Sequence, residues 1–106
     1  MARIIRITRL DAEERLGDVP EDKRFWCHDG KVLKNLAELE AALESMSEDT
    51  FRYHSNETKN DFSNWAKEVI GDEKLSRDLL KSTTQAQAAK SVASRIAWLK
   101  DKLAVE

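Results

Sequence analysis

The chain has 106 residues, of which 41% are hydrophobic and 36% are charged. This length is close to the commonest domain size, so we expect one domain with one core. The apolar fraction excludes a chain that is disordered throughout. The formal net charge of −2 gives the whole chain no attraction for nucleic acid, whose general binders are usually strongly basic.

The cysteine content and the hydropathy of the chain indicate the cellular compartment in which the protein is expected. Cys27 is the only cysteine, which excludes an intrachain disulfide and fits a reducing environment. No apolar run approaches the roughly 20 residues of a membrane span. The first ten residues, MARIIRITRL, are too short and too interrupted by arginine for a signal peptide. We therefore expect a cytoplasmic protein without a membrane partner.

The first 24 residues are expected to form an extension of strand and loop. Residues 3–8 are rich in β-branched side chains, which predicts a short strand, although their pattern also fits a helix. The following stretch contains Gly17 and Pro20, and it predicts a turn of helix and then a loop. Beyond it, two short apolar stretches flank Asp29-Gly30, which is the local signal of a tight hairpin.

Helix-capping residues divide the middle of the chain. Asn35 and Ser47 are placed to cap helices over about 36–46 and 48–54, and Asn60 or Asp61 is placed to cap the next one. Gly71 supplies the left-handed residue that ends that helix. Its inward stripe is predicted to be Phe62, Trp65, Ala66 and Val69.

A long final helix is predicted to close the fold. Asp72 can start a short helix with Leu75 and Leu79 inward, and Ser82 followed by Gln85 has the spacing of a capping box for the last helix. The inward stripe of that helix is predicted to be Ala89, Val92, Ala93, Ile96, Leu99 and Leu103.

These elements predict a mainly α fold, in which a compact bundle of four to five helices carries a short N-terminal β strand or hairpin. The single domain over residues 1–106 would consist of the extension 1–24, a core 25–82 that bears the motifs, and the final helix 83–106.

One group of polar residues has a chemical interpretation. The turn between two predicted helices brings His54 toward Asn60 and Asp61, and a carboxylate beside an imidazole can orient it for proton transfer. The sequence offers no nucleophile and no glycine-rich loop to complete an active site. The more frequent role of such residues is to satisfy backbone groups at a helix junction, so no catalytic residue is assigned.

Two further groups were weighed for binding. Trp26 next to Phe25, and Trp98 beside the inward face of the final helix, are candidates for a contact surface, although Trp98 also fits the edge of the core. Arg95 near Trp98 could meet an acidic partner or belong to a solvated face. Cys27 and His28 are metal-ligating types, but no Cys-x2-Cys or His-x3-His pair accompanies them. We expect neither a metal nor another cofactor.

One extended motif carries a resemblance. Phe25-x4-Gly30-x2-Leu33-x-Asn35-Leu36-x-Glu38-Leu39 is followed by His54-x5-Asn60-Asp61-Phe62-x2-Trp65-x5-Gly71-Asp72. Over residues 25–80 this pattern resembles a family of small uncharacterised bacterial and archaeal domains. The resemblance implies a helical domain that starts with a short hairpin. It implies no activity, cofactor or catalytic residue.

The leading functional hypothesis is therefore a protein-binding or adaptor module that is not an enzyme. Self-association through the final helix is a special case, because Ala86, Ala88, Ala89 and Ala93 would let a second helix approach closely. Two alternatives remain. One is nucleic-acid association through Arg3, Arg6, Arg9 and the basic final helix, and the other is a small ligand or acid/base site at His54, Asn60 and Asp61.

Overall fold

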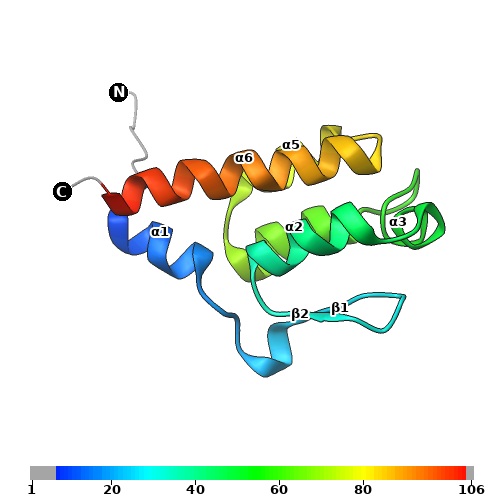
Figure 1. The fold of residues 1–106 in the computed structure, drawn as a ribbon, viewed down its shortest axis with the longest axis horizontal. Helices are drawn as coiled ribbons and strands as arrows, with labels where there is room; N and C mark the ends of the chain where they lie inside the picture. Colours follow the sequence, from blue (N-terminus) through cyan, green and yellow to red (C-terminus); the bar gives the residue numbers. More distant parts are fainter. Residues whose placement is uncertain (1–6, 105–106) are drawn as a thin grey trace.

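A computed structural model describes residues 7–104 of the chain (Figure 1). The mainly helical fold with a short hairpin near its start is confirmed. The elements in chain order are α1 (Arg9–Leu16), the 3-10 turn η1 (Glu21–Lys23), β1 (Phe25–Trp26), β2 (Val32–Leu33), α2 (Leu36–Ser45), α3 (Glu48–His54), α4 (Asp61–Trp65), the π-helical segment η2 (Ala66–Ile70), α5 (Glu73–Lys81) and α6 (Gln85–Ala104).

The helix α1 is a full helix where only a turn was expected. Its start is fixed by a capping box, in which Thr8 Oγ1 accepts from the Asp11 amide at 3.1 Å and Asp11 Oδ2 accepts from the Thr8 amide at 3.0 Å. The predicted strand over residues 3–8 lies outside the described residues except for its last two. Thr8, one of those two, is extended but serves as the cap of α1.

The long helix α6 is the axis against which the others pack. Figure 1 shows it running along the length of the molecule, with α1 beneath its C-terminal end and α2 beside its N-terminal half. It packs against α1, α2 and α5. Val92 and Leu99 are fully buried at these contacts, as the apolar stripe predicted, and Ile96 is 7% exposed. Ala88 and Ala89 are also buried, and their small size lets α2 approach closely. No helix within residues 7–104 has the length and apolar character needed to cross a membrane.

A cluster of aromatic rings forms the core beneath the hairpin. Phe62 stacks on Phe25 at 5.3 Å and on Phe51 at 5.8 Å between ring centroids. The Trp65 ring meets Phe25 edge-on at 5.9 Å, and the His54 ring does so at 5.0 Å. Offset-stacked and edge-to-face pairs of this kind stabilise a core beyond the area that they bury. Phe25 thereby anchors the hairpin to α3 and α4.

The register of the hairpin separates an inner and an outer face. Phe25 pairs with Leu33 and Trp26 pairs with Val32 in an antiparallel ladder. Side chains of directly opposed residues lie on the same face, so the first pair is buried and the second is exposed. Gly30 closes the turn with φ of 96°, as the Asp-Gly pattern predicted.

Most of the predicted caps are confirmed. The side chains of Asn35, Ser47, Asn60 and Asp72 each accept from the backbone amide three residues later. The capping box at Ser82 is wrong, because Thr84 Oγ1 accepts from the Gln87 amide at 3.1 Å and caps α6. Ser82 is buried at the end of α5 instead.

A π-helical turn separates α4 from α5. The amides of both Gly71 and Asp72 donate to the Ala66 carbonyl, which widens the last turn by one residue. Residues five apart then share a face, so Ile70 follows Trp65 into the core. The prediction placed Val69 there, and Val69 is only partly buried. Gly71 ends the segment with φ of 81°, as predicted.

We expect Gly71→Ala to destabilise the protein by about 1 kcal/mol, because a β-carbon is disfavoured in the left-handed region. Gly71→Asn should cost less, since asparagine tolerates that conformation. Urea unfolding followed by circular dichroism measures both variants. Open space surrounds the site where a β-carbon would lie, so a steric clash does not confound the comparison. Equal losses for alanine and asparagine would contradict this explanation.

Candidate functional site

Five of the six candidate residues of the sequence fall into two separate places. Trp26, His54 and Asp61 border one shallow depression beside the hairpin. Arg95 and Trp98 line a groove between α5 and α6. Asn60 borders neither of them.

Asn60 has a structural role at the junction of α4 and α5. Its side-chain oxygen accepts from the Ser63 amide at 3.0 Å, and its side-chain nitrogen donates to the Leu79 carbonyl at 3.1 Å. It therefore caps the start of α4 and gives a second donor to the Leu79 carbonyl near the end of α5, which also accepts from the Ser82 amide at 3.1 Å.

His54 is buried, and both of its ring nitrogens have partners. Nε2 accepts from the backbone amide of His28 at 2.9 Å, and Nδ1 lies 2.9 Å from Asp61 Oδ2. Since Nε2 accepts, the ring proton is on Nδ1 and is donated to the carboxylate. Lys59 Nζ also contacts Asp61 Oδ2, at 3.1 Å. The imidazole thus ties the hairpin to the α3–α4 junction, and it has no free nitrogen for proton transfer.

Trp26 is the most exposed of the large hydrophobic side chains in residues 7–104, at 73%. The depression beside it is lined on its other sides by Arg24, Asn64 and Glu68, together with the edges of Phe25 and Trp65. Trp65 is core, and its Nε1 donates to the Lys23 carbonyl at 2.8 Å. A large apolar side chain therefore lies in solvent next to a polar hollow on a well-anchored hairpin.

Arg24 was not singled out by the sequence. Its Nε is buried, and it is the one buried side-chain nitrogen or oxygen within residues 7–104 that has no hydrogen-bond partner. A buried donor without an acceptor costs about 1–3 kcal/mol, so such groups call for an explanation. Its neighbour Trp26 is the signal that could have drawn attention to it, since tryptophan and arginine together are typical of binding surfaces.

Arg95 is buried, and here the structure corrects the expectation that it forms part of a contact surface beside Trp98. It is only 7% exposed, and its Nε donates to Asp72 Oδ2 at 2.8 Å. Arg15 Nη1 contacts the same oxygen at 3.1 Å. Asp72 itself is fully buried, and its other oxygen caps α5 by accepting from the Leu75 amide at 2.9 Å. One carboxylate therefore joins α1, α5 and α6.

The environment of Asp72 favours its charged form. Burial raises the pKa of this carboxyl, but the Arg95 hydrogen bond, the Leu75 amide and the charges of the two arginines together outweigh burial and lower it. Asp72 is thus ionised at neutral pH. Two guanidinium groups share its single negative charge, so the centre has a net charge of +1.

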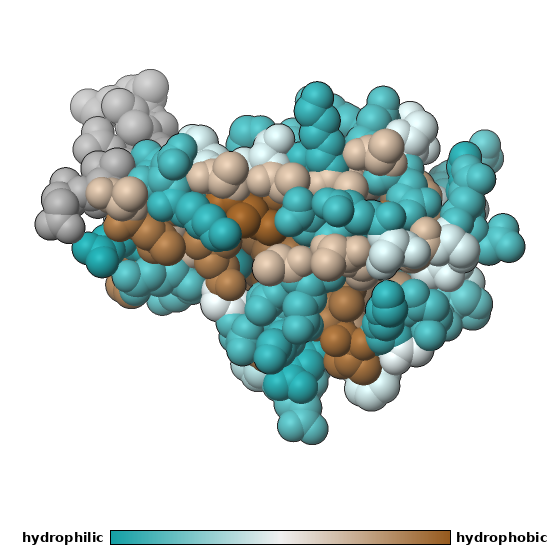
Figure 2. Space-filling view, viewed as in Figure 1, coloured by the Kyte–Doolittle hydropathy of each residue, from teal (hydrophilic) through white to brown (hydrophobic). Residues whose placement is uncertain are grey.

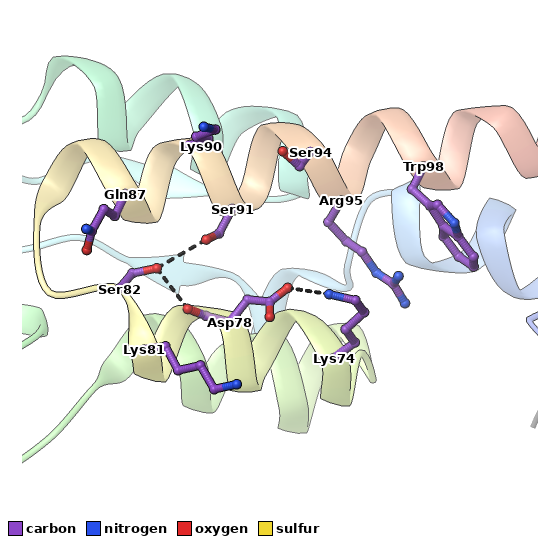
Figure 3. Close-up of a pocket in the computed structure, with 10 residues that line it drawn as sticks. All are labelled: Lys74, Asp78, Lys81, Ser82, Gln87, Lys90, Ser91, Ser94, Arg95 and Trp98. Atoms are coloured by element: carbon purple, nitrogen blue, oxygen red, sulfur yellow. Dashed lines mark hydrogen bonds and ion pairs between the residues drawn. The ribbon is translucent and has the colours of Figure 1, made fainter.

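Trp98 lies over this centre at the molecular surface. It is 39% exposed, and the Arg95 guanidinium lies 4.4 Å from the centroid of its ring. Lys102 Nζ lies 4.8 Å from the same centroid. Figure 3 shows Arg95 and Trp98 next to each other on α6, with both side chains extending toward the α5 side of the groove. The sequence placed these two residues together correctly but missed the carboxylate that holds Arg95.

The sequence also singled out Cys27 and His28, whose side chains could bind a metal or react. Burial raises the pKa of the Cys27 thiol, which keeps it protonated and a poor metal ligand or nucleophile at neutral pH. No group of three His, Cys, Asp or Glu side chains in residues 7–104 is arranged to hold a metal ion. His28 stacks on Tyr53 at 3.9 Å between ring centroids.

The alanine run of α6 is divided between the core and the surface. Ala88 and Ala89 are buried, whereas Ala86 is exposed and Ala93 is partly buried. A shallow groove between α2 and α6 runs past Ala86, Ala89 and Ala93. Figure 2 shows pale brown residues in rows along both helices on this face, between hydrophilic side chains. Half of the predicted association surface is therefore used within the chain.

The fold and these sites define a small helical domain whose polar clusters are mostly structural. Comparison of the chain with protein-family models, with curated proteins and with solved structures found no match. The resemblance drawn from the His54 to Asp72 motif therefore stays a prediction.

We expect His54 to be the Nδ1–H tautomer, because Nε2 accepts the His28 amide. A long-range nitrogen–proton correlation spectrum distinguishes the two tautomers directly. His28 is exposed and serves as an internal reference in the same spectrum. An Nε2–H tautomer at His54 would contradict the geometry described above.

We expect Asp72→Asn to cost about 3–5 kcal/mol at pH 7, since it leaves two arginines without their buried counter-charge. Because the pKa of Asp72 is lowered from 3.8, its contribution is present above that pH and is lost as pH falls through the folded-state value. The gap between the variant and the natural protein should therefore narrow below about pH 4.

Asp78→Asn is the matched control for that measurement. Asp78 pairs with Lys74 at 2.7 Å, but this pair is partly exposed and should contribute less than about 1 kcal/mol. Urea titrations at several pH values measure both variants. Similar losses for the two, or a gap that is independent of pH, would show that Asp72 is not the ionic centre of the fold.

Proposed function

We propose that this chain is a non-catalytic protein-binding module that acts in the cytoplasm, and that it binds its partner through the outer face of the hairpin. This hairpin surface consists of Arg24, Trp26 and Val32. The observation that carries the proposal is the 73% exposure of Trp26 on a hairpin that is firmly anchored from below. The lone buried cysteine is in keeping with the cytoplasm.

The energy available from Trp26 is large. Tryptophan buries 150–250 Å² when it is enclosed, so covering the exposed part of Trp26 would contribute roughly 3 kcal/mol at about 25 cal/mol per Å². Val32, its cross-strand partner, is 38% exposed on the same face and extends the apolar contact. Tryptophan and arginine are also the residue types that dominate the energetics of protein interfaces.

Arg24 specifies what the partner must provide. Its buried Nε lacks an acceptor, and it lies beside the hollow next to Trp26. When the Arg24 side chain turns outward on association, a carbonyl or carboxylate oxygen of the partner can accept from this donor while the partner covers the indole. The complementary surface is therefore an apolar pocket with a hydrogen-bond acceptor at its rim.

The support beneath the hairpin favours binding because little conformational entropy would be lost on association. Phe25 is locked in the aromatic cluster, and the His28 amide is held by His54. Side chains that are already fixed in the free protein cost less entropy when a partner binds. This support separates Trp26 from an exposed residue on a mobile loop.

The decisive experiment is site-specific photocrosslinking in the cells that produce the protein. A photoreactive phenylalanine derivative replaces Trp26 in one version and Leu80 in another. Leu80 is 62% exposed on α5 and serves as a matched apolar control. We expect a discrete crosslinked product from position 26 that is absent from position 80. An excess of the natural protein without the photoreactive group should reduce the yield of this product, whereas an excess of Trp26→Thr protein should not.

Two other outcomes are informative. A product with twice the mass of this chain identifies self-association, the special case in which a second copy is the partner. Crosslinking that is equal at both positions, or competition by Trp26→Thr protein, would overturn the assignment of the hairpin surface. Circular dichroism of Trp26→Thr should match that of the natural protein, since the replaced side chain is exposed.

A further inference from the structure

The groove between α5 and α6 has a strong excess of positive charge. It has a volume of about 680 Å³, and its lining includes Lys74 and Lys81 from α5 and Lys90 and Arg95 from α6. Asp78 is the one acidic residue of the lining, so the net charge is +3 from four cations and one carboxylate. This charge contrasts with the net charge of −2 for the whole chain.

The deepest of these cations is a buried side chain with free donors. Arg95 uses Nε for Asp72, and its terminal nitrogens make no hydrogen bond or ion pair in the part of the chain that the structure describes. Figure 3 shows the guanidinium group extending from α6 toward Lys74. Asp72 offers one negative charge to two arginines, and Asp11 acts on Arg15 through its charge, but in residues 7–104 no carboxylate other than Asp72 contacts the Arg95 guanidinium. A buried guanidinium with excess charge and free N–H groups is suited to bind an anion.

Trp98 holds this cation in place and is not itself a platform for an aromatic ligand. Arg95 and Lys102 already lie over its ring, at 4.4 Å and 4.8 Å from the centroid. The rest of the lining supplies neutral hydrogen-bonding groups, namely Gln87, Ser91 and Ser94. The chemistry of the groove is therefore that of an anion site with additional hydroxyl and amide donors.

The spacing of the cations indicates more than one negative group on the ligand. Lys74 and Lys81 are seven residues apart on α5, which corresponds to about 10 Å along a helix. A single carboxylate or phosphate contacts both ends of such a row only if both lysine side chains bend toward it, whereas a chain of two or three phosphoryl groups spans the row with the side chains extended. Lys74 Nζ lies 2.7 Å from Asp78 in the free protein, so it would share its charge between Asp78 and the ligand. We propose that the α5–α6 groove binds a small oligophosphate or a multiply phosphorylated metabolite.

Long polyanions fit the groove less well. The stretch from Asp11 to Asp22 contains six acidic residues and only one arginine. Its first part belongs to α1, which packs against α6, so it would repel a nucleic acid that extended from the groove toward α1. The proposal therefore commits to a small ligand, and nucleic-acid binding is an outcome that would overturn it.

Titration calorimetry with inorganic tripolyphosphate tests the proposal on the full chain at low salt. Lys81→Gln/Lys90→Gln removes two groove cations that are exposed and have no ion pair in residues 7–104. Lys67→Gln/Lys100→Gln removes two exposed lysines outside the groove, so both variants carry the same net charge. We expect binding to weaken about tenfold or more in the first variant and less than twofold in the second.

A second readout locates the ligand. In a nitrogen–proton spectrum of the natural protein, tripolyphosphate should shift the Arg95 Nε–H and the Trp98 indole N–H and leave the Trp26 indole unchanged. The absence of binding, or equal weakening in the two charge-matched variants, would overturn the proposal. Tighter binding of single-stranded nucleic acid than of tripolyphosphate, with the same dependence on Lys81 and Lys90, would overturn the commitment to a small ligand.

Discussion

The buried carboxylate of Asp72 is the constraint on which most of the fold depends. It caps α5 through one oxygen and binds Arg15 from α1 and Arg95 from α6 through the other. α1 is distant in the sequence from the consecutive helices α5 and α6, and apolar packing alone would fix the distances between the three but not their register. The directional hydrogen bonds of a carboxylate fix that register. The π-helical turn before Asp72 contains one more residue than an α-helical turn. Together with the left-handed Gly71, it directs the Asp72 side chain into the core.

A buried ion centre of this kind is not an efficient way to gain stability. Well-packed apolar residues of similar volume often stabilise a protein as much or more. The excess of one guanidinium over one carboxylate makes the centre still less favourable for stability alone. This cost has a physical explanation if the second guanidinium serves a ligand, since the free N–H groups of Arg95 open onto the cationic groove. Arg24, with its unsatisfied Nε beside Trp26, has the same character on the opposite side of the core.

The difference between what the sequence predicts and what the structure contains follows a physical rule. Local signals gave the right elements, since the caps at Asn35, Ser47, Asn60 and Asp72 act within one turn of helix. Long-range pairs left no such signal: Asp72 and Arg95 are 23 residues apart, and no local pattern connects them. Spacing did contain a clue, because Arg95 is three residues after Val92 and four before Leu99, which places it on the inward stripe. The prediction nevertheless placed Arg95 at the surface, because a charged side chain is usually exposed.

His54 illustrates the same rule for the candidate site. The sequence correctly brought His54 near Asp61, because only a short turn separates them. It could not show that Nε2 accepts the amide of His28, 26 residues away across the hairpin. That contact changes the interpretation of the imidazole from a proton carrier to a bridge. A histidine next to a carboxylate is therefore an incomplete description of a site until the partner of its second nitrogen is known.

The two proposed surfaces share one support, the segment from Trp65 to Asp72. Its first residue donates to the Lys23 carbonyl just before the hairpin, and its last residue binds the arginine beneath the groove. Contact continuity alone does not establish energetic coupling between two sites. It does mean that both surfaces lose their geometry when this segment unfolds. Changes within the segment should thus impair stability and both kinds of binding together, whereas changes at exposed Trp26 or Lys90 should separate them.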